Sequence, residues 1–172
     1  MVKHDIKEII RKTLTISDNL APELAFRAAA AKYINYSHTA TFDDAIIMFN
    51  DIFEDEITNS VKIVDSSGVS RENYVTCEFM CKCLMKLYEC SDFKTLLAQP
   101  NEGTLSNRLL FLKDNLRAKT GTLSCTSALL GTLKTKNNKN LVFCTIVQNS
   151  PKRKAVIKNF ENRFVGLLYR KY

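Results

Sequence analysis

The sequence lacks long apolar runs, runs of like charge and internal repeats. No stretch of about 18 apolar residues occurs, so we expect no transmembrane segment. No run of five like charges occurs, and 25 basic against 18 acidic side chains give a net charge of +7. This mild excess does not require an anionic partner, and we expect no nucleic-acid binding. The polar start of the chain has no apolar h-region, so no secretory signal is expected.

What the chain does contain suits one globular domain. It has 172 residues, of which 45% are hydrophobic, and this apolar content argues against disorder. Six cysteines are enough for three disulfides, but a chain of this size does not need such crosslinks to be stable. We therefore interpret the cysteines as reduced thiols.

The cysteines and histidines do not have the spacing of a metal site. Four cysteines lie in one predicted helix or within two residues of its ends: Cys77, Cys81, Cys83 and Cys90. At about 100° per residue they form two pairs on different sides of that helix, so they cannot converge on one ion. His4 and His38 have no acidic or cysteine partner at catalytic spacing. We expect no metal site and interpret these cysteines as small core residues.

Hydrophobic periodicity predicts that the first two thirds of the chain are mainly helical. Helices are predicted over residues of about 3–16, 23–31, 42–53 and 79–88. Pro22 suits the start of the second helix, and Thr41 with Asp44 has the spacing of a capping box before the third. Val61 to Val64 has the pattern of a short strand, and residues 65–68 have the composition of a turn.

The last third predicts a β-hairpin and a final helix. Ser127 to Leu133 and Leu141 to Val147 have strand patterns, separated by a polar turn over residues 136–139. Ser150 and Pro151 have the residue types of an N-cap and a first helical position.

The order of these elements predicts an α+β fold, because helices come first and antiparallel strands follow. We expect one domain, with a mainly helical part over about 1–112. Antiparallel strands and a C-terminal helix would follow over about 113–172.

Two short motifs carry the chemistry. The first is Ser17-Asp18-Asn19, and the second is Lys119-Thr120-Gly121-Thr122. A lysine on a strand can point a cation into a cleft, and a glycine lets a ligand approach the backbone. Each motif alone is weak. Together they are the Ser-x-Asn and Lys-Thr-Gly elements of the serine β-lactamases and penicillin-binding proteins, in that order.

The surrounding sequence resembles the class C low-molecular-mass penicillin-binding proteins, which are D-alanyl-D-alanine carboxypeptidases and endopeptidases of peptidoglycan. The resemblance runs from about Ile6 to Asn149 and rests on the segments Ser17–Leu24, Val64–Arg71, Glu102–Leu105 with Arg108, Arg117–Ser124 and Ser127–Gly131. It implies the C-terminal part of the β-lactamase/transpeptidase-like fold.

The resemblance also implies roles in acyl transfer for three residues. Ser17 would relay a proton towards the leaving amine, Asn19 would donate a hydrogen bond to a substrate carbonyl, and Lys119 would supply positive charge. No metal or organic cofactor is implied.

Three further residues are implied to bind substrate. Thr120 would hydrogen-bond the terminal carboxylate of the peptide, and the backbone N–H of Thr122, beside Gly121, would form half of an oxyanion hole. The implied partners are a peptidoglycan stem peptide or a β-lactam. Residues 65–71 and 103–108 are interpreted as scaffold beside the cleft.

One element of the family pattern lies upstream of Ser-x-Asn: the Ser-x-x-Lys that carries the nucleophile. Only 16 residues precede Ser17, so we expect this element to be missing. Ser91 and Lys94 have the spacing, but one such match is what chance predicts, and it follows Ser-x-Asn. The chain is therefore interpreted as part of a carboxypeptidase, as an inactive remnant that binds peptidoglycan peptides, or as a folding remnant without activity. The resembled family is periplasmic, but the sequence shows no secretory signal, so it does not predict the compartment of this protein.

The resemblance implies a five-stranded sheet of which this chain supplies three strands. The outer edge of the strand over Leu141 to Val147 would then be open, without a charge or proline along it. The apolar stripe through Phe42, Phe49 and Phe53 would be partly exposed. We therefore expect marginal stability, with self-association or pairing with a complementary N-terminal fragment.

Overall fold

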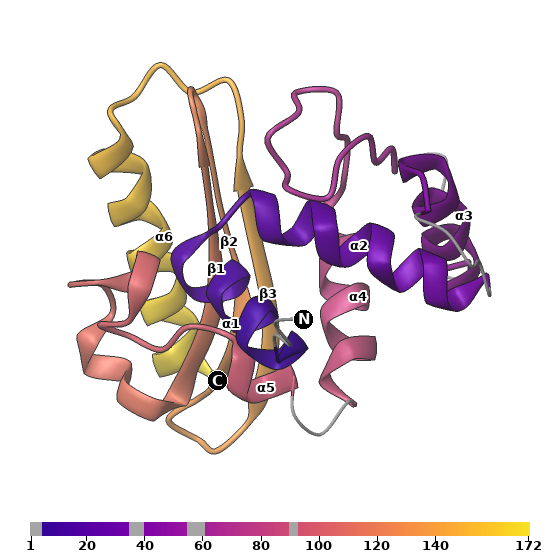
Figure 1. Cartoon of the computed structure of the whole chain (residues 1–172). Coiled ribbons are helices and arrows are strands. Elements are labelled where there is room, and N and C mark those ends of the chain that lie inside the picture. The colour runs from indigo at the N-terminus through magenta and orange to yellow at the C-terminus, as the bar shows by residue number, and fades with distance from the viewer. Residues whose placement is uncertain (1–4, 35–39, 55–60, 90–92) are drawn as a thin grey trace.

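The computed structural model describes residues 5–34, 40–54, 61–89 and 93–172. A three-stranded sheet stands at its centre, with the C-terminal helix α6 (Lys154–Lys171) on one face and α4 (Cys77–Tyr88) on the other (Figure 1). His4, His38, Cys90 and Ser91 lie outside the described residues. Among the described helices, none is long and apolar enough to cross a membrane.

The sheet is antiparallel, with strand order β1-β2-β3. Its strands are β1 (Leu116–Leu123), β2 (Thr126–Lys134) and β3 (Asn140–Val147), so the predicted hairpin is confirmed to within one residue at each end. Side chains alternate between the two faces along each strand.

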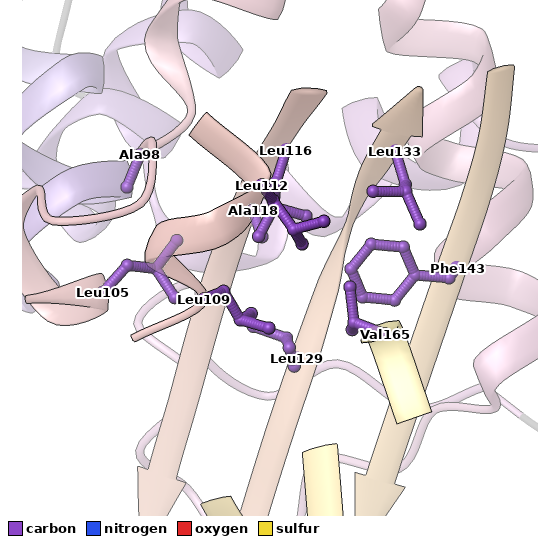
Figure 2. Close-up of a cluster of buried hydrophobic side chains, with 10 residues drawn as sticks. All are labelled: Ala98, Leu105, Leu109, Leu112, Leu116, Ala118, Leu129, Leu133, Phe143 and Val165. Carbon is purple, nitrogen blue, oxygen red and sulfur yellow. The ribbon is translucent and has the colours of Figure 1, made fainter. Parts of the chain in front are cut away.

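The face towards α6 carries the main hydrophobic core. Its buried side chains come from all three strands, from α6 and from the loops before β1 (Figure 2). They are Ala98, Leu105, Leu109, Leu112, Leu116, Ala118, Leu129, Leu133, Phe143 and Val165. From α6, Val165 is buried in this core and Phe164, Leu168 and Tyr169 pack against it. Other apolar side chains of α6 remain exposed, namely Val156, Phe160 and Leu167.

A buried ion pair crosses this core. Glu161 of α6 is completely buried; it accepts hydrogen bonds from the Arg108 guanidinium at 2.7 Å and from the Ser127 hydroxyl at 2.6 Å. Arg108 also donates to the side chain of Asn162. Because both carboxylate oxygens are satisfied, the charge is tolerated away from water.

The helices before the sheet are short. They are α1 (Ile6–Ile16), α2 (Leu20–Tyr33), α3 (Phe42–Ile52), α4 and α5 (Phe93–Leu96), followed by the 3-10 turns η1 (Gly103–Leu105) and η2 (Leu110–Asn115). The predicted capping box is confirmed, because the Thr41 hydroxyl accepts from the Asp44 backbone and the Asp44 carboxylate accepts from the Thr41 backbone.

A second cluster joins α2, α3 and α4 through aromatic rings. Ring centroids lie 5.0 to 6.5 Å apart, and most pairs meet edge to face, among Phe26, Phe42, Phe49, Phe53 and Phe79. The stripe on α3 therefore packs against rings of α2 and α4. Its phenylalanines remain half-buried rather than fully covered.

The predicted strand at Val61 to Val64 is wrong. Only Lys62 pairs there, in an isolated bridge with Tyr74. The reason is a side chain, since the Asn73 amide oxygen accepts from the Val64 backbone at 2.8 Å and replaces the strand partner that this N–H would need.

The predicted helix start at Ser150 and Pro151 is also wrong. Helix α6 begins at Lys154, with Arg153 at the N-cap. Ser150 instead donates its backbone N–H to the Cys125 carbonyl, and its hydroxyl accepts from the Lys152 backbone. The serine therefore closes a local turn after β3 and does not cap the helix.

Candidate active site

The structure brings Ser17 and Lys119 together. The Lys119 ammonium lies 2.7 Å from the Ser17 hydroxyl oxygen, although the two residues are 102 positions apart. Lys119 also donates to the Thr120 carbonyl. Because the ammonium donates to the serine oxygen, the serine's own proton is left to donate to another group.

The junction between α1 and α2 presents Ser17 to the strand. Ser17 is the C-cap of α1 and has a left-handed backbone, with φ of 64°. Asp18 caps α2 instead, since its carboxylate accepts from the backbones of Leu20 and Ala21 at 2.9 and 2.8 Å. Asn19 makes no side-chain cap hydrogen bond and is exposed. Of these three residues, Asp18 therefore does the capping, and the Ser17 hydroxyl is directed to Lys119.

The segment before η2 holds the end of α1 in place. Gly103 has φ of +48°, and a Cβ atom there would lie 2.1 Å from the Thr15 carbonyl oxygen. Glu102 pairs with Arg11 of α1, and it also accepts from the Gln99 backbone. These contacts support the interpretation of residues 103–108 as scaffold, and they fix the turn that carries Ser17.

Lys119 sits in a partly dehydrated place. Burial lowers the pKa of Lys119 from 10.5 to about 8. Desolvation disfavours the charged ammonium, but at neutral pH most of the population remains protonated. A cation held in such a place attracts a carboxylate more strongly than a solvated one does.

The other three residues of the second motif do not contact Ser17 as Lys119 does. Thr120 lies on the opposite face of β1 from Lys119 and is buried, with 6% of its surface exposed. Its carbonyl, rather than its hydroxyl, meets the Lys119 ammonium. Gly121 and Thr122 are exposed. β1 is an outer strand, so these two residues lie on an edge where a ligand backbone has access.

A hydrogen-bonded loop lies beside the end of β1. Burial alone would raise the pKa of Asp65, but hydrogen bonds from the Asn73 side chain and from the backbones of Ser70 and Gly68 lower it overall. The Arg71 guanidinium reaches the Ser124 carbonyl at 3.5 Å.

This loop is also joined to α2 through a residue that the sequence analysis missed. The Glu23 carboxylate accepts from the backbones of Ser66 and Ser67, both at 2.9 Å. A glutamate near the start of a helix gives no sequence signal for a contact with a loop about 43 residues away.

A cavity of about 470 Å³ lies between the end of α4 and the starts of β1 and β3, but none of the residues of the two motifs lines it. Across the described ranges, no three histidine, cysteine or acidic side chains are grouped to hold a metal ion.

Comparison with models of protein families shows to which family the chain belongs. The family model for D-Ala-D-Ala carboxypeptidase 3 (S13) matches residues 3–171. The chain belongs to this S13 family. Both motifs fall inside the matched range, so the resemblance to penicillin-binding proteins is confirmed. No protein with a curated description matches the chain significantly.

Solved structures show the fold of this S13 chain. Penicillin-binding protein 4 of Haemophilus influenzae, complexed with a β-lactam, has a TM-score of 0.81 and 24% identity. The match covers 95% of the S13 chain and 41% of that protein. A predatory endopeptidase of Bdellovibrio bacteriovorus, in complex with an immunity protein, has a TM-score of 0.72 at 18% identity, over 95% and 43% of the two chains.

The TLA-3 extended-spectrum β-lactamase is also similar, with a TM-score of 0.68 and 16% identity over 98% of this chain and 64% of the enzyme. These matches confirm the predicted fold class, the C-terminal part of the β-lactamase/transpeptidase-like fold. The S13 chain spans about two fifths of the length of penicillin-binding protein 4.

Proposed function

We propose that this S13 chain supplies the Ser-x-Asn and Lys-Thr-Gly side of a serine-type D-alanyl-D-alanine carboxypeptidase site that acts on peptidoglycan stem peptides. The observation that carries the proposal is the 2.7 Å contact between Lys119 and Ser17. Membership of the S13 family supports the substrate class.

In this proposal Lys119 has two tasks. Its ammonium attracts the terminal carboxylate of the peptide, and its hydrogen bond to the Ser17 oxygen orients the serine proton towards the substrate. Ser17 then passes that proton to the leaving amine when the D-alanyl–D-alanine bond breaks. The exposed Asn19 amide donates to a carbonyl of the stem peptide.

The edge of β1 provides the rest of the binding surface. An extended peptide can lie along an outer strand and use its backbone groups, which suits the exposed Gly121 and Thr122. The Thr122 N–H is proposed as one donor of the oxyanion hole. Thr120 is proposed to act on the carboxylate only through its support of Lys119, because its side chain is buried on the other face.

The attacking serine is proposed to come from outside these 172 residues. The one Ser-x-x-Lys of the sequence ends at Lys94, whose ammonium lies 4.0 Å from the ring centre of Tyr88 beyond the end of α4. A complementary N-terminal fragment would provide the nucleophile. Without such a fragment, the same surface binds the peptide and performs no chemistry.

Calorimetric titration with an N-acylated D-Ala-D-Ala peptide tests the binding step. We expect binding at pH 7, loss of at least about tenfold in affinity in Lys119→Met, and no binding of the L-Ala-L-Ala peptide. Lys62→Met is the matched control, since this exposed lysine pairs with Glu72 and not with Ser17. Equal affinity for the two peptides, or an unchanged affinity in Lys119→Met, would contradict the proposal.

Intact-mass measurement after incubation with penicillin tests the origin of the nucleophile. The 172-residue chain by itself is expected to form no covalent adduct, because β-lactams acylate the serine of Ser-x-x-Lys. A stoichiometric adduct mapped to Ser91 would show that the chain carries its own nucleophile.

A further inference from the structure

Helix α4 and strand β3 bring three cysteines into one cluster. Cys77 and Cys81 are one turn apart on α4, and Cys144 lies in the middle of β3. α4 packs directly on β3. Phe143 and Thr145 are buried on the α6 face, so the strand alternation turns Cys144 towards α4. The Cys144 thiol therefore lies near Cys77 and Cys81.

The three thiols are half-buried, which leaves them accessible to a small reagent. Burial raises the pKa of the Cys144 thiol, and its contacts with Cys77 and Cys81 raise it further. Burial and the nearby Cys77 also raise the pKa of Cys81. These two thiols are therefore neutral at pH 7, which makes both metal binding and thiol–disulfide exchange slow, because each needs the thiolate.

We propose that Cys77 and Cys144 are a dithiol–disulfide site that reversibly ties α4 to the central sheet. The oxidant is a low-molecular-mass disulfide. Cys77 loses its proton to solvent, attacks one sulfur of that disulfide and expels one thiolate. Cys144 then loses its proton, attacks the Cys77 sulfur and expels the second thiolate. The protein loses two hydrogens, and the reagent is reduced to two thiols.

The crosslink would lie on the same face of the sheet as Lys119, two strands away from it. Lys119 and Cys144 both pair with Leu130, from opposite sides of β2, so all three side chains share one row on the α4 face of the sheet. A bond between residues 77 and 144 would close a long loop and restrict the unfolded chain. We expect the oxidised protein to melt at least about 5 °C higher than the reduced protein.

Peptide mapping of the wild-type chain tests the proposal without any variant. The folded protein is incubated with oxidised glutathione, alkylated and digested with trypsin. We expect a crosslink between the peptide that holds Cys77 and Cys81 and the peptide that holds Cys144. The mass of the linked product should be about 2 Da below the sum of the two free peptides, which marks one disulfide.

Single variants identify the bonded pair. The crosslink should persist in Cys81→Ser and in Cys125→Ser, a matched control because Cys125 is exposed in the turn between β1 and β2. It should disappear in Cys77→Ser and in Cys144→Ser. A folded wild-type chain with every thiol still alkylated after oxidation would overturn the proposal. A Cys77–Cys81 bond, or a crosslink that survives in Cys144→Ser, would do the same.

Discussion

Lys119 of β1 donates a 2.7 Å hydrogen bond to Ser17, the left-handed residue that ends α1. This contact joins the helical part of the chain to the sheet at the place where both motifs meet. It also holds a cation in a partly dehydrated position, which has a consequence for stability.

We predict that Lys119→Met stabilises the chain at pH 7 by on the order of 1–3 kcal/mol, because folding withdraws the lysine charge from water. The pKa of Lys119 is about 8 in the folded chain and 10.5 without burial, so the unfolded state binds more protons between these values. Wild-type stability should therefore rise as the pH increases from about 8 to 10.5, and the advantage of the variant should shrink in parallel. Urea unfolding at pH 7, 9 and 10.5 measures both.

This outcome would identify Lys119 as a residue retained for binding at the expense of stability. A variant that is less stable than the wild type at pH 7 would show instead that the lysine holds the fold together.

For the buried pair of Arg108 and Glu161 we predict the opposite effect of a substitution, a loss of stability. Glu161→Gln should lower the free energy of unfolding by about 3–5 kcal/mol, because it leaves the Arg108 charge buried without a counter-charge. Chemical denaturation provides the measurement. Glu78→Gln is the matched control; it breaks an exposed pair with Lys82 and should change stability by less than about 1 kcal/mol. Equal effects of the two variants would contradict the role assigned to the buried pair.

The outer edge of β3 has no partner strand in the part of the chain that the structure describes. We predict concentration-dependent self-association, because unpaired backbone groups on an apolar edge template further strands. Sedimentation velocity at several concentrations should show it. Val142→Lys should weaken the association, since a lysine on an edge strand opposes pairing, whereas Val142→Thr should not. A monomer at every concentration would show that the edge is protected.

Local patterns predicted much of this fold. The capping box of Thr41 and Asp44 and the hairpin over β2 and β3 depend on residues close in sequence, and both are confirmed. The predicted start of α6 was wrong because Ser150 can either cap a helix or close a turn, and its hydrogen bond to the Cys125 carbonyl selects the turn. The strand at residues 61–64 was wrong because the Asn73 side chain takes a backbone N–H that a neighbouring strand would otherwise bind.

Contacts between distant segments were less accessible to sequence reasoning. The two motifs could be paired only through a family resemblance, since nothing local connects Ser17 to Lys119. Glu161 was missed altogether, because a glutamate among lysines and arginines reads as part of a solvated helix face. The helical spacing correctly placed Cys77 and Cys81 on one side of α4. It could not show that Cys144 of β3 lies near them, because that contact joins two distant elements.

Titration of the Lys119 side chain by NMR, with the signal assigned through Lys119→Met, tests the central claim most directly. The account predicts a midpoint of about 8 in the free chain. Addition of an N-acylated D-Ala-D-Ala peptide should raise that midpoint, because a bound carboxylate favours the ammonium, and the L-Ala-L-Ala peptide should leave it unchanged. A midpoint near 10.5 in the free chain, or one that the D-Ala-D-Ala peptide does not move, would contradict a buried Ser17–Lys119 site that binds the peptide terminus.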